Sequence, residues 1–212
     1  MTLRLHHSPM ACSLASRFAL AESGLDHEIV VVRTRTGEHL TEAYGRINPR
    51  RKVPALETGG GVVTESSAIL PLIADLAPDA GLLPSDPIAR AQAQSWIGFL
   101  ASTVHPAFTR SMFPERFTTD ADGAEGVRGG ALEALASALS SIDAHLAGRE
   151  HLLDAFSVCD LYLTVFLLWR RGPALAGRLP DLPNLDAFQQ RVLARPAVAA
   201  ALGEDMKAMA GG

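Results

Sequence analysis

Four short stretches of this sequence carry side chains whose type and position suit binding or catalysis. The first is the run 8–13, Ser-Pro-Met-Ala-Cys-Ser, which lies between a predicted strand and a predicted helix. A thiol at a helix N-terminus faces unpaired backbone N–H groups and the positive end of the helix dipole. We therefore expect Cys12 to have a lowered pKa and thiolate character. The same N–H groups can stabilise a ligand's thiolate, and the alternative is a small buried cysteine beside a turn.

The second and third stretches lie at the ends of predicted strands. If the Val53-Pro54 bond is cis, the Val53 backbone groups can face a peptide-like ligand, although cis bonds are uncommon and an ordinary edge-strand proline is the alternative. In Thr64-Glu65-Ser66, Ser66 can cap the next helix, whose N–H groups can bind a carboxylate. Glu65 can receive an ammonium group. Together they can hold an amino-acid head group, but taken alone this stretch is better explained by Ser66 or Ser67 as a plain N-cap.

The fourth stretch, residues 157–160, has the form of a capping box. Ser157 is followed three residues later by Asp160, where Glu is commoner, and a long apolar helix begins here. We interpret this pair as a device for folding and stability. Cys159 is then a core thiol rather than a catalyst.

The arrangement of predicted elements indicates an α/β domain followed by an all-α domain. Apolar periodicity and turn residues predict the order β-α-β-α-β-β-α in residues 1–78. Prolines and glycine cluster in 79–86, which we interpret as a linker. Residues 87–212 show no convincing strand. Their predicted helices are 88–112, 125–147, 157–171, 184–194 and 197–209, with a polar loop at 114–124.

Composition excludes several classes of protein. The 212 residues are 48% hydrophobic with a formal net charge of -4, so neither nucleic acid nor an anionic membrane is an expected partner. The N-terminus has no apolar run typical of a secretory signal, and 161–169 is too short to span a bilayer. Cys12 and Cys159 are the only cysteines, which gives no disulfide framework and no metal-ligand pattern. We expect a cytoplasmic protein without a metal.

The order and spacing of these motifs resemble the cytosolic glutathione transferase family over essentially the whole chain. The closest likeness is to the bacterial beta class. The marks that carry it are Ser8-Pro9 with Ala11-Cys12-Ser13, Ile47-Asn48-Pro49, Val53-Pro54-Ala55-Leu56, Thr64-Glu65-Ser66, and Trp96-Ile97-Gly98-Phe99-Leu100 with His105. The resemblance implies a thioredoxin-like glutathione-binding domain followed by a helical bundle.

The resemblance also assigns expected roles to residues. It implies a cis bond at Pro54, with Val53 pairing with the cysteinyl backbone of glutathione, and it makes Glu65 and Ser66 the holders of the γ-glutamyl group. Cys12 would lie beside the glutathione sulfur and can form a mixed disulfide with it. The other implied roles are a nearby hydroxyl at Ser13, a proton handler or donor at His105, a basic residue at Arg35, and an electrophile pocket against Met10, Phe108 and Met112.

Some positions depart from the pattern of the beta class. Gly98 stands where an asparagine is frequent, Pro106 where a basic residue often follows the histidine, Met10 where a glycine is common, and His7 where a tyrosine is. Arg35 is an uncertain match for the basic residue after the second strand. These departures predict weaker glutathione binding or tuning to another thiol or acceptor.

The resemblance implies a glutathione-dependent enzyme of the kind used in detoxification. Conjugation to a small hydrophobic electrophile, thiol-disulfide exchange through Cys12, isomerisation and reductive dehalogenation are all chemistries of this fold. The alternative class is a non-catalytic binding or interaction protein, which the departures favour and the retained Cys12, Glu65 and Ser66 oppose. The resemblance further implies a homodimer, the commonest symmetric oligomer of soluble proteins.

Overall fold

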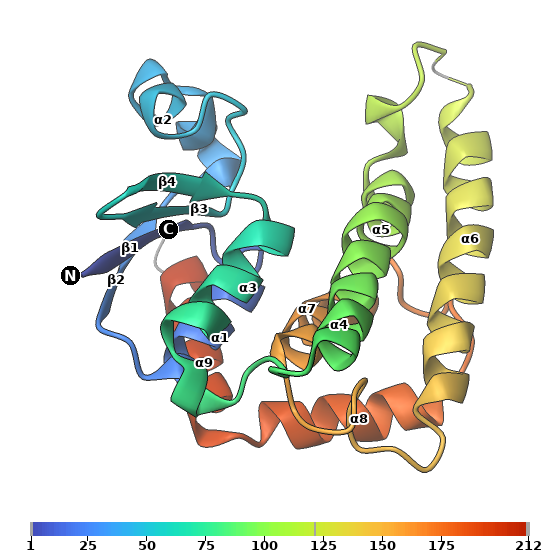
Figure 1. Ribbon diagram of the computed structural model, residues 1–212. Coiled ribbons are helices and arrows are strands. Elements are labelled where there is room, and N and C mark those ends of the chain that lie inside the picture. The colour runs from blue at the N-terminus through green and yellow to red at the C-terminus, as the bar shows by residue number, and fades with distance from the viewer. Residues whose placement is uncertain (1, 121, 211–212) are drawn as a thin grey trace.

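The first part of the chain forms the predicted α/β unit (Figure 1). The computed structural model describes residues 2–120 and 122–210. Its first elements are β1 (Leu3–His7), α1 (Leu14–Ser23), β2 (His27–Val31), α2 (Glu42–Ile47), β3 (Ala55–Thr58), β4 (Gly61–Thr64) and α3 (Ser66–Leu76). Short 3-10 turns precede α2 and follow α3. The predicted βαβαββα order is therefore confirmed.

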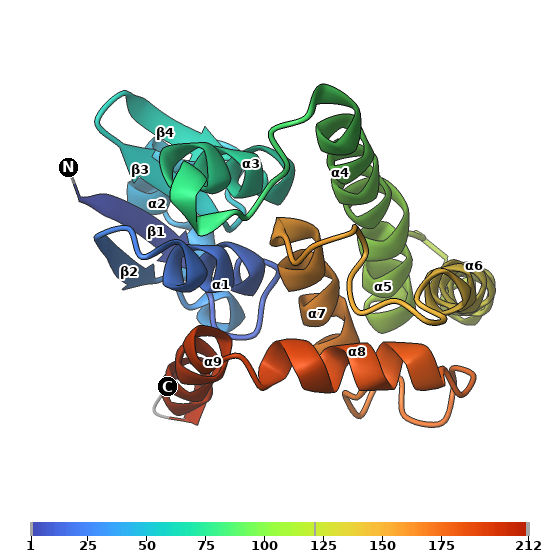
Figure 2. The same ribbon diagram turned by 60° about the horizontal axis from the view of Figure 1, so that its bottom comes forward.

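The four strands form one mixed sheet in the order β2-β1-β3-β4. β1 pairs with β2 in parallel and with β3 antiparallel, and β3 and β4 form the predicted hairpin. Helices α1 and α3 cover one face of the sheet, whereas α2 lies on the other (Figures 1 and 2). Because β1 and β3 are neighbours, the loop after β1 and the segment before β3 meet at one edge of the sheet.

Helix α1 is buried along most of its length. All residues from Leu14 to Leu20 are buried, including the large side chains of Leu14 and Phe18, which lie one helical turn apart. Gly24 ends the helix with φ 70°, the left-handed conformation that a glycine C-cap adopts without a steric cost. Figure 2 shows the reason for this burial: α1 lies between the sheet and the helices α7 and α9 of the second part of the chain.

The second part contains only helices in its described residues. They are α4 (Pro87–Phe99), α5 (His105–Met112), α6 (Ala124–His145), α7 (Val158–Arg170), α8 (Pro183–Leu193) and α9 (Pro196–Ala210), with a 3-10 turn at Pro114–Arg116. None of the helices in the described ranges is long and apolar enough to cross a membrane.

The predicted helix 88–112 is interrupted rather than uniform. Residues Leu100–Val104 between α4 and α5 form a π-helical segment, in which the His105 N–H donates to Leu100 O. Pro106 explains this irregularity, because proline has no N–H and its ring clashes with the carbonyl four residues before it in a regular α-helix. Such π segments occur often at functional sites, and this one carries His105.

Helix α7 occupies the centre of the helical part and begins with the predicted capping box. Ser157 N donates to Asp160 Oδ2 at 2.8 Å, and the Ser157 hydroxyl accepts from Cys159 N at 3.2 Å. Asp160 Oδ1 also accepts from Leu152 N at 2.9 Å, which ties the preceding loop to the helix. Cys159 is a fully buried core thiol, as expected, and its Sγ lies 3.4 Å from Ala93 O.

We expect Asp160→Ala to lower the free energy of unfolding by about 2–4 kcal/mol, because it removes a helix cap and leaves two buried N–H donors without an acceptor. Urea denaturation followed by circular dichroism measures this change. Asp154→Ala is the matched control: Asp154 is fully exposed and pairs with Arg149 at 3.8 Å only at the surface, so its loss should leave the free energy of unfolding nearly unchanged. Equal losses in both variants would contradict a structural role for Asp160.

Candidate functional site

The loop between β1 and α1 brings Cys12 against the segment before β3. Cys12 is half-buried, and its Sγ donates to the Val53 carbonyl oxygen at 3.4 Å. The Val53-Pro54 peptide bond is cis, so that prediction is confirmed. The two sequence stretches singled out at 8–13 and 53–54 therefore form one place in the fold, at the edge where β1 and β3 meet.

The expected thiolate character of Cys12 is wrong for the ligand-free protein. Burial of the sulfur raises the pKa of Cys12 to about 11, although the backbone N–H groups of Ser13 and Cys12 act in the opposite direction. The charge of Glu65 adds to the rise and that of Lys52 opposes it. The helix-end amides are present as predicted, but desolvation outweighs them. Cys12 is consequently a neutral thiol at pH 7 that can donate a hydrogen bond.

The β4–α3 junction places an acidic side chain and a helix N-terminus near this thiol. Glu65 is exposed, has φ 73°, and is itself the N-cap residue of α3, so the prediction that Ser66 caps the helix is wrong. Ser66 is instead the buried first residue of the helix. The first N–H groups of a helix have no partner inside it, and here they belong to Ser66 and Ser67. Arg50 lies 3.8 Å from the Glu65 carboxylate.

One basic side chain acts through its charge on the Cys12 thiol. Arg35 is exposed in the turn Thr34–Thr36, and no charge from it acts on Cys12. The charge that does act on Cys12 is Lys52, which directly precedes Val53. Burial, and then the charges of Lys52 and Arg116, lower the pKa of His39. The adjacency of Lys52 to Val53 was a sequence signal that could have identified it.

His105 lies in the helical domain next to two aromatic rings. Its ring centroid is 5.5 Å from that of Phe166 and 5.4 Å from that of Trp169. Burial among these rings lowers the pKa of His105 to about 4. The imidazole is therefore uncharged at pH 7, where it can donate one hydrogen bond but cannot serve as a positively charged acid.

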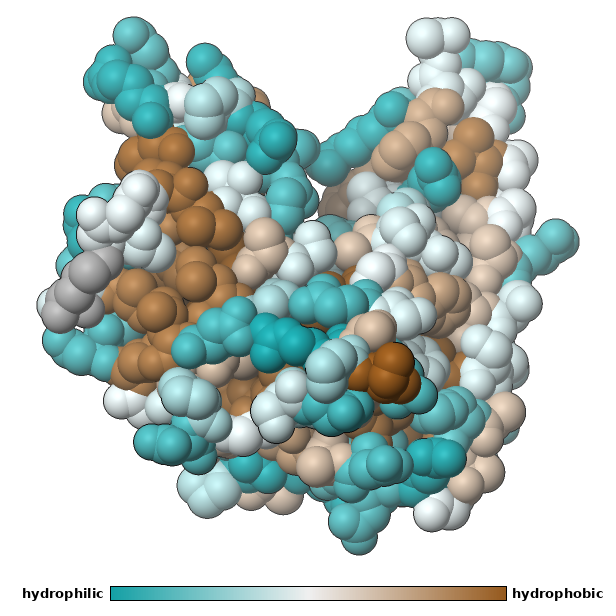
Figure 3. Space-filling view, in the orientation of Figure 1, coloured by the Kyte–Doolittle hydropathy of each residue, from teal (hydrophilic) through white to brown (hydrophobic). Residues whose placement is uncertain are grey.

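The residues expected in the electrophile pocket differ in exposure. Met10 and Met112 are half-buried, which suits a pocket wall. Phe108 is fully buried, with its ring stacked on Phe166 at 5.7 Å, so it supports the wall from behind instead of facing a ligand. Figure 3 shows the surface hollowed into a notch between the lobe that carries α2 and the lobe that carries the tips of α5 and α6.

Ser13 does not face this notch. It is fully buried, and its Oγ lies 2.8 Å from His7 Nδ1 and accepts from Ser8 N at 3.1 Å. His7 in turn bonds to Asp205 on α9. Asp205 and Trp169 both contact the loop 8–13, and sequence reasoning missed them because they lie more than 150 positions away along the chain.

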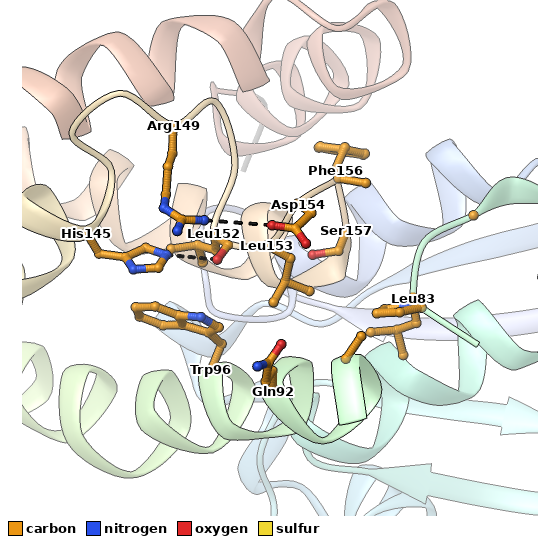
Figure 4. A pocket seen from close by; sticks show the side chains of 14 residues that line it. Leu83, Gln92, Trp96, His145, Arg149, Leu152, Leu153, Asp154, Phe156 and Ser157 are labelled. Atoms are coloured by element: carbon orange, nitrogen blue, oxygen red, sulfur yellow. Dashed lines mark hydrogen bonds and ion pairs between the residues drawn. The ribbon is translucent and has the colours of Figure 1, made fainter. Parts of the chain in front are cut away.

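A separate cavity of about 490 Å³ lies in the helical domain (Figure 4). Trp96 of α4 and His145 of α6 line it, with His145 Nε2 2.9 Å from Leu152 O and Arg149 paired with Asp154. None of the predicted glutathione-site residues lines this cavity. Within the described ranges no group of His, Cys, Asp and Glu side chains is arranged to hold a metal ion.

The state of His105 gives a pH-dependent prediction. The folded protein binds the His105 proton only near pH 4, whereas the unfolded chain binds it near 6.5. Stability is therefore lost as pH falls from 6.5 to 4, by at most about 1.4 kcal/mol per pH unit from this group. We expect His105→Gln to flatten this part of the stability curve, measured by urea denaturation at each pH. An unchanged slope, or an NMR titration of His105 near 6.5, would contradict the assignment.

Sequence comparison places these features in a known family. Residues 9–76 match the family described as glutathione S-transferase, N-terminal domain. Glutathione S-transferase GST-4.5 of Xanthomonas campestris pv. campestris is 36% identical over 94% of this chain and 97% of its own length. Glutathione S-transferase GstA of Escherichia coli O157:H7 is 32% identical over 96% of this chain and 98% of its own.

Solved structures agree with the sequence relatives. A glutathione S-transferase from Xylella fastidiosa superposes with a TM-score of 0.88 at 32% identity, covering 96% of this chain and 98% of that one. A bacterial beta class glutathione S-transferase from Sphingomonas chungbukensis superposes with a TM-score of 0.80 at 37% identity. The match covers 95% of this chain and 98% of that one. Near-complete coverage in both directions, together with the half-buried cysteine beside a cis Val-Pro bond, means that this chain belongs to the glutathione S-transferase family.

Proposed function

We propose that this glutathione transferase binds glutathione along the edge formed by the loop 8–13, Val53 and the start of α3, and joins its sulfur to a small hydrophobic electrophile. Family membership over nearly the whole chain makes the protein a transferase enzyme with glutathione as co-substrate, rather than a non-catalytic binding protein. The observation that carries the site assignment is the Cys12 thiol donating to Val53 O at 3.4 Å.

The proposed pose matches the charges of glutathione to those of the site. Val53 pairs with the cysteinyl backbone, which brings the glutathione sulfur to Cys12. Glu65 receives the ammonium of the γ-glutamyl group, and the free N–H groups at the start of α3 receive its carboxylate. The glycine carboxylate of glutathione pairs with the ammonium group of Lys52, which precedes Val53. In this pose Lys52 takes the role first expected of Arg35.

The protonated state of Cys12 favours conjugation over exchange. Glutathione releases its thiol proton to solvent as it binds. The neutral Cys12 thiol can then turn its S–H from Val53 O to the resulting thiolate and stabilise it, together with the Ser13 N–H. The glutathione sulfur then forms a bond to the electrophilic carbon, and the electron pair leaves with the displaced group. Exchange would instead require the Cys12 thiolate to attack a disulfide, form Cys12–S–S–glutathione and release a thiolate. With a pKa of about 11, little thiolate is present at pH 7.

The proposed electrophile lies in the notch between the domains. Met10 from the first domain and Met112 from the second supply half-buried apolar contacts. The uncharged His105 imidazole supplies a single hydrogen-bond donor beside them. These features suit a small, mostly apolar electrophile with one acceptor atom. A bacterial cytoplasm, where glutathione is reduced, is the proposed location.

The proposed homodimer uses apolar surface on the sheet domain. A groove of about 430 Å³ is lined by residues of β4 and α3, among them Val62, which is 44% exposed, and Leu76, which is 46% exposed. Figure 3 shows apolar surface gathered on the lobe of the sheet domain. Contiguous exposed apolar surface of this kind marks interaction sites in soluble proteins. We propose that the helical domain of a second copy covers it.

Two cysteine variants test the role of Cys12. We expect Cys12→Ser to retain glutathione binding in calorimetry and to lower kcat/KM for conjugation about tenfold, because its hydroxyl still donates a hydrogen bond. Cys12→Ala, which removes the donor, should cost about 100-fold. Intact mass after prolonged treatment with oxidised glutathione at pH 9–10, where a fraction of Cys12 is ionised, should show an adduct on the wild type and none on either variant. Cys159→Ala is the control and should keep the adduct, since Cys159 is fully buried. An adduct on Cys12→Ser would overturn the assignment.

Charged substitutions in the groove test the dimer. The wild type is expected to sediment as a dimer at micromolar concentration. Leu76→Glu and Val62→Glu should shift it to monomer, because each would bury an unpaired carboxylate at the interface. Met209→Glu is the matched control, since Met209 is also an exposed apolar side chain, 42% accessible, but lies on α9 away from the groove. A monomeric wild type, or dimers that persist in both groove variants, would refute this interface.

A further inference from the structure

The residue two positions before Cys12 has an unfavourable backbone conformation. Met10 has φ 58°, in the left-handed region that side chains with a Cβ rarely adopt. The family pattern commonly has glycine here, for which this conformation has no steric cost. Strained residues of this kind persist only where the surrounding structure over-determines them. The contacts that hold Met10 are therefore informative.

Both backbone polar groups of Met10 are bound by the helical domain. Its N–H donates to Asp205 Oδ2 on α9 at 2.7 Å, and its carbonyl oxygen accepts from Trp169 Nε1 on α7 at 2.8 Å. These bonds span 195 and 159 positions of the chain. Figure 2 shows α7 and α9 on the side of α1 that faces away from the sheet. The loop that carries Cys12 is thus held from the second domain.

The carboxylate of Asp205 fixes more of the loop than Met10 alone. It is fully buried, and its Oδ1 accepts from His7 Nε2 at 2.5 Å and from Arg17 Nη1 at 2.9 Å. The other ring nitrogen of His7 reaches Ser13 Oγ at 2.8 Å. The Asp205 carboxylate therefore bonds directly to His7 at the end of β1 and to Met10. Through His7 it is also linked to Ser13, the residue after Cys12. Burial opposes ionisation of Asp205, but the bonds from His7 and Met10 and the Arg17 charge outweigh it and lower its pKa.

We propose that Asp205 and Trp169 are positioning residues for the thiol chemistry: they hold Met10 in its left-handed conformation and so place Cys12 Sγ against Val53 and the glutathione sulfur. This inference rests on the proposed function for its catalytic consequence. Neither residue need touch glutathione, since both act through the backbone of Met10. In this chain, which has methionine where glycine is common, the helical domain supplies the constraint that the conformation requires.

The first test uses variants that each remove one of these bonds. Trp169→Phe keeps an aromatic ring against His105 and Phe166 but deletes the Nε1 donor, and Asp205→Asn keeps the size of the side chain. Rates of Cys12 alkylation by iodoacetamide, followed by mass spectrometry between pH 7 and 10, report on the thiol without glutathione. The ionisable groups that interact with Cys12, namely Lys52, Glu65, Tyr44 and Tyr162, are unchanged in Trp169→Phe.

A released loop should expose the thiol, so each variant should alkylate about tenfold faster at pH 8, as expected for a fall of one unit in apparent pKa. Conjugation should slow about 10- to 100-fold in kcat, the effect of a reacting group displaced by about 1 Å. Glu204→Gln is the control: Glu204 neighbours Asp205 and pairs with Arg17, but is 70% exposed and does not touch Met10. It should alkylate and turn over like the wild type.

The second test separates positioning from general support of the fold. Because glycine adopts φ 58° without strain, Met10→Gly should reduce the dependence of the loop on its helical-domain bonds. We expect Met10→Gly/Trp169→Phe to alkylate within about twofold of Met10→Gly alone. Wild-type alkylation in Trp169→Phe would overturn the proposal, as would a double variant that shows the full effect of Trp169→Phe. If Asp205→Asn fails to fold, the alkylation rates of Trp169→Phe and of Met10→Gly/Trp169→Phe still test the proposal. Failure of the wild type to bind glutathione would refute the proposed function. The alkylation rates, which are measured without glutathione, would still test how Asp205 and Trp169 position the thiol.

Discussion

The burial of α1 between the sheet and the helical domain is the constraint on which the rest of this structure depends. A helix that packed on the sheet alone would expose one side, yet residues Leu14 to Leu20 are all buried. The two domains therefore share one hydrophobic core, which extends from Leu5 in β1 to Val198 in α9. Since the loop with Cys12 leads directly into α1, the position of the thiol is set by both domains together.

Desolvation decides the chemistry of the two titratable residues at this junction. The amides at the start of α1 favour a Cys12 thiolate and lower its pKa. Burial of the sulfur disfavours the charged form by more, so the pKa of Cys12 rises to about 11. The same effect among aromatic rings lowers the pKa of His105 to about 4. Both groups are uncharged at pH 7. In the proposed glutathione site, Cys12 and His105 are therefore neutral hydrogen-bond donors, and Lys52 and Glu65 supply the charges that act on Cys12.

Local patterns in the sequence predicted the elements well and the contacts between distant elements poorly. The order of the elements in the first domain and the capping box at Ser157 depend on patterns within a few residues, and both predictions are confirmed. The bond from Asp205 to Met10 crosses 195 positions, and no local pattern indicates it. The pKa of Cys12 was predicted in the wrong direction for the same reason. A helix terminus is visible in the sequence, whereas the extent of burial depends on the assembled fold.

The departures from the beta-class pattern differ in their structural consequences. Met10 and Pro106 both disfavour the local backbone geometry, and the structure accommodates each: two hydrogen bonds hold Met10, and the π-helical segment before Pro106 removes the clash with the preceding turn. Gly98 is a different case. A Cβ there would meet nothing within 4 Å, so glycine is not required by packing, and the polar side chain frequent at this position is lost without replacement. The two backbone departures thus preserve the geometry around Cys12 and His105, while the change at Gly98 removes a potential polar contact from the helical side. We propose that this combination keeps the thiol site in place and makes its helical wall less polar, which favours an apolar electrophile over a charged one.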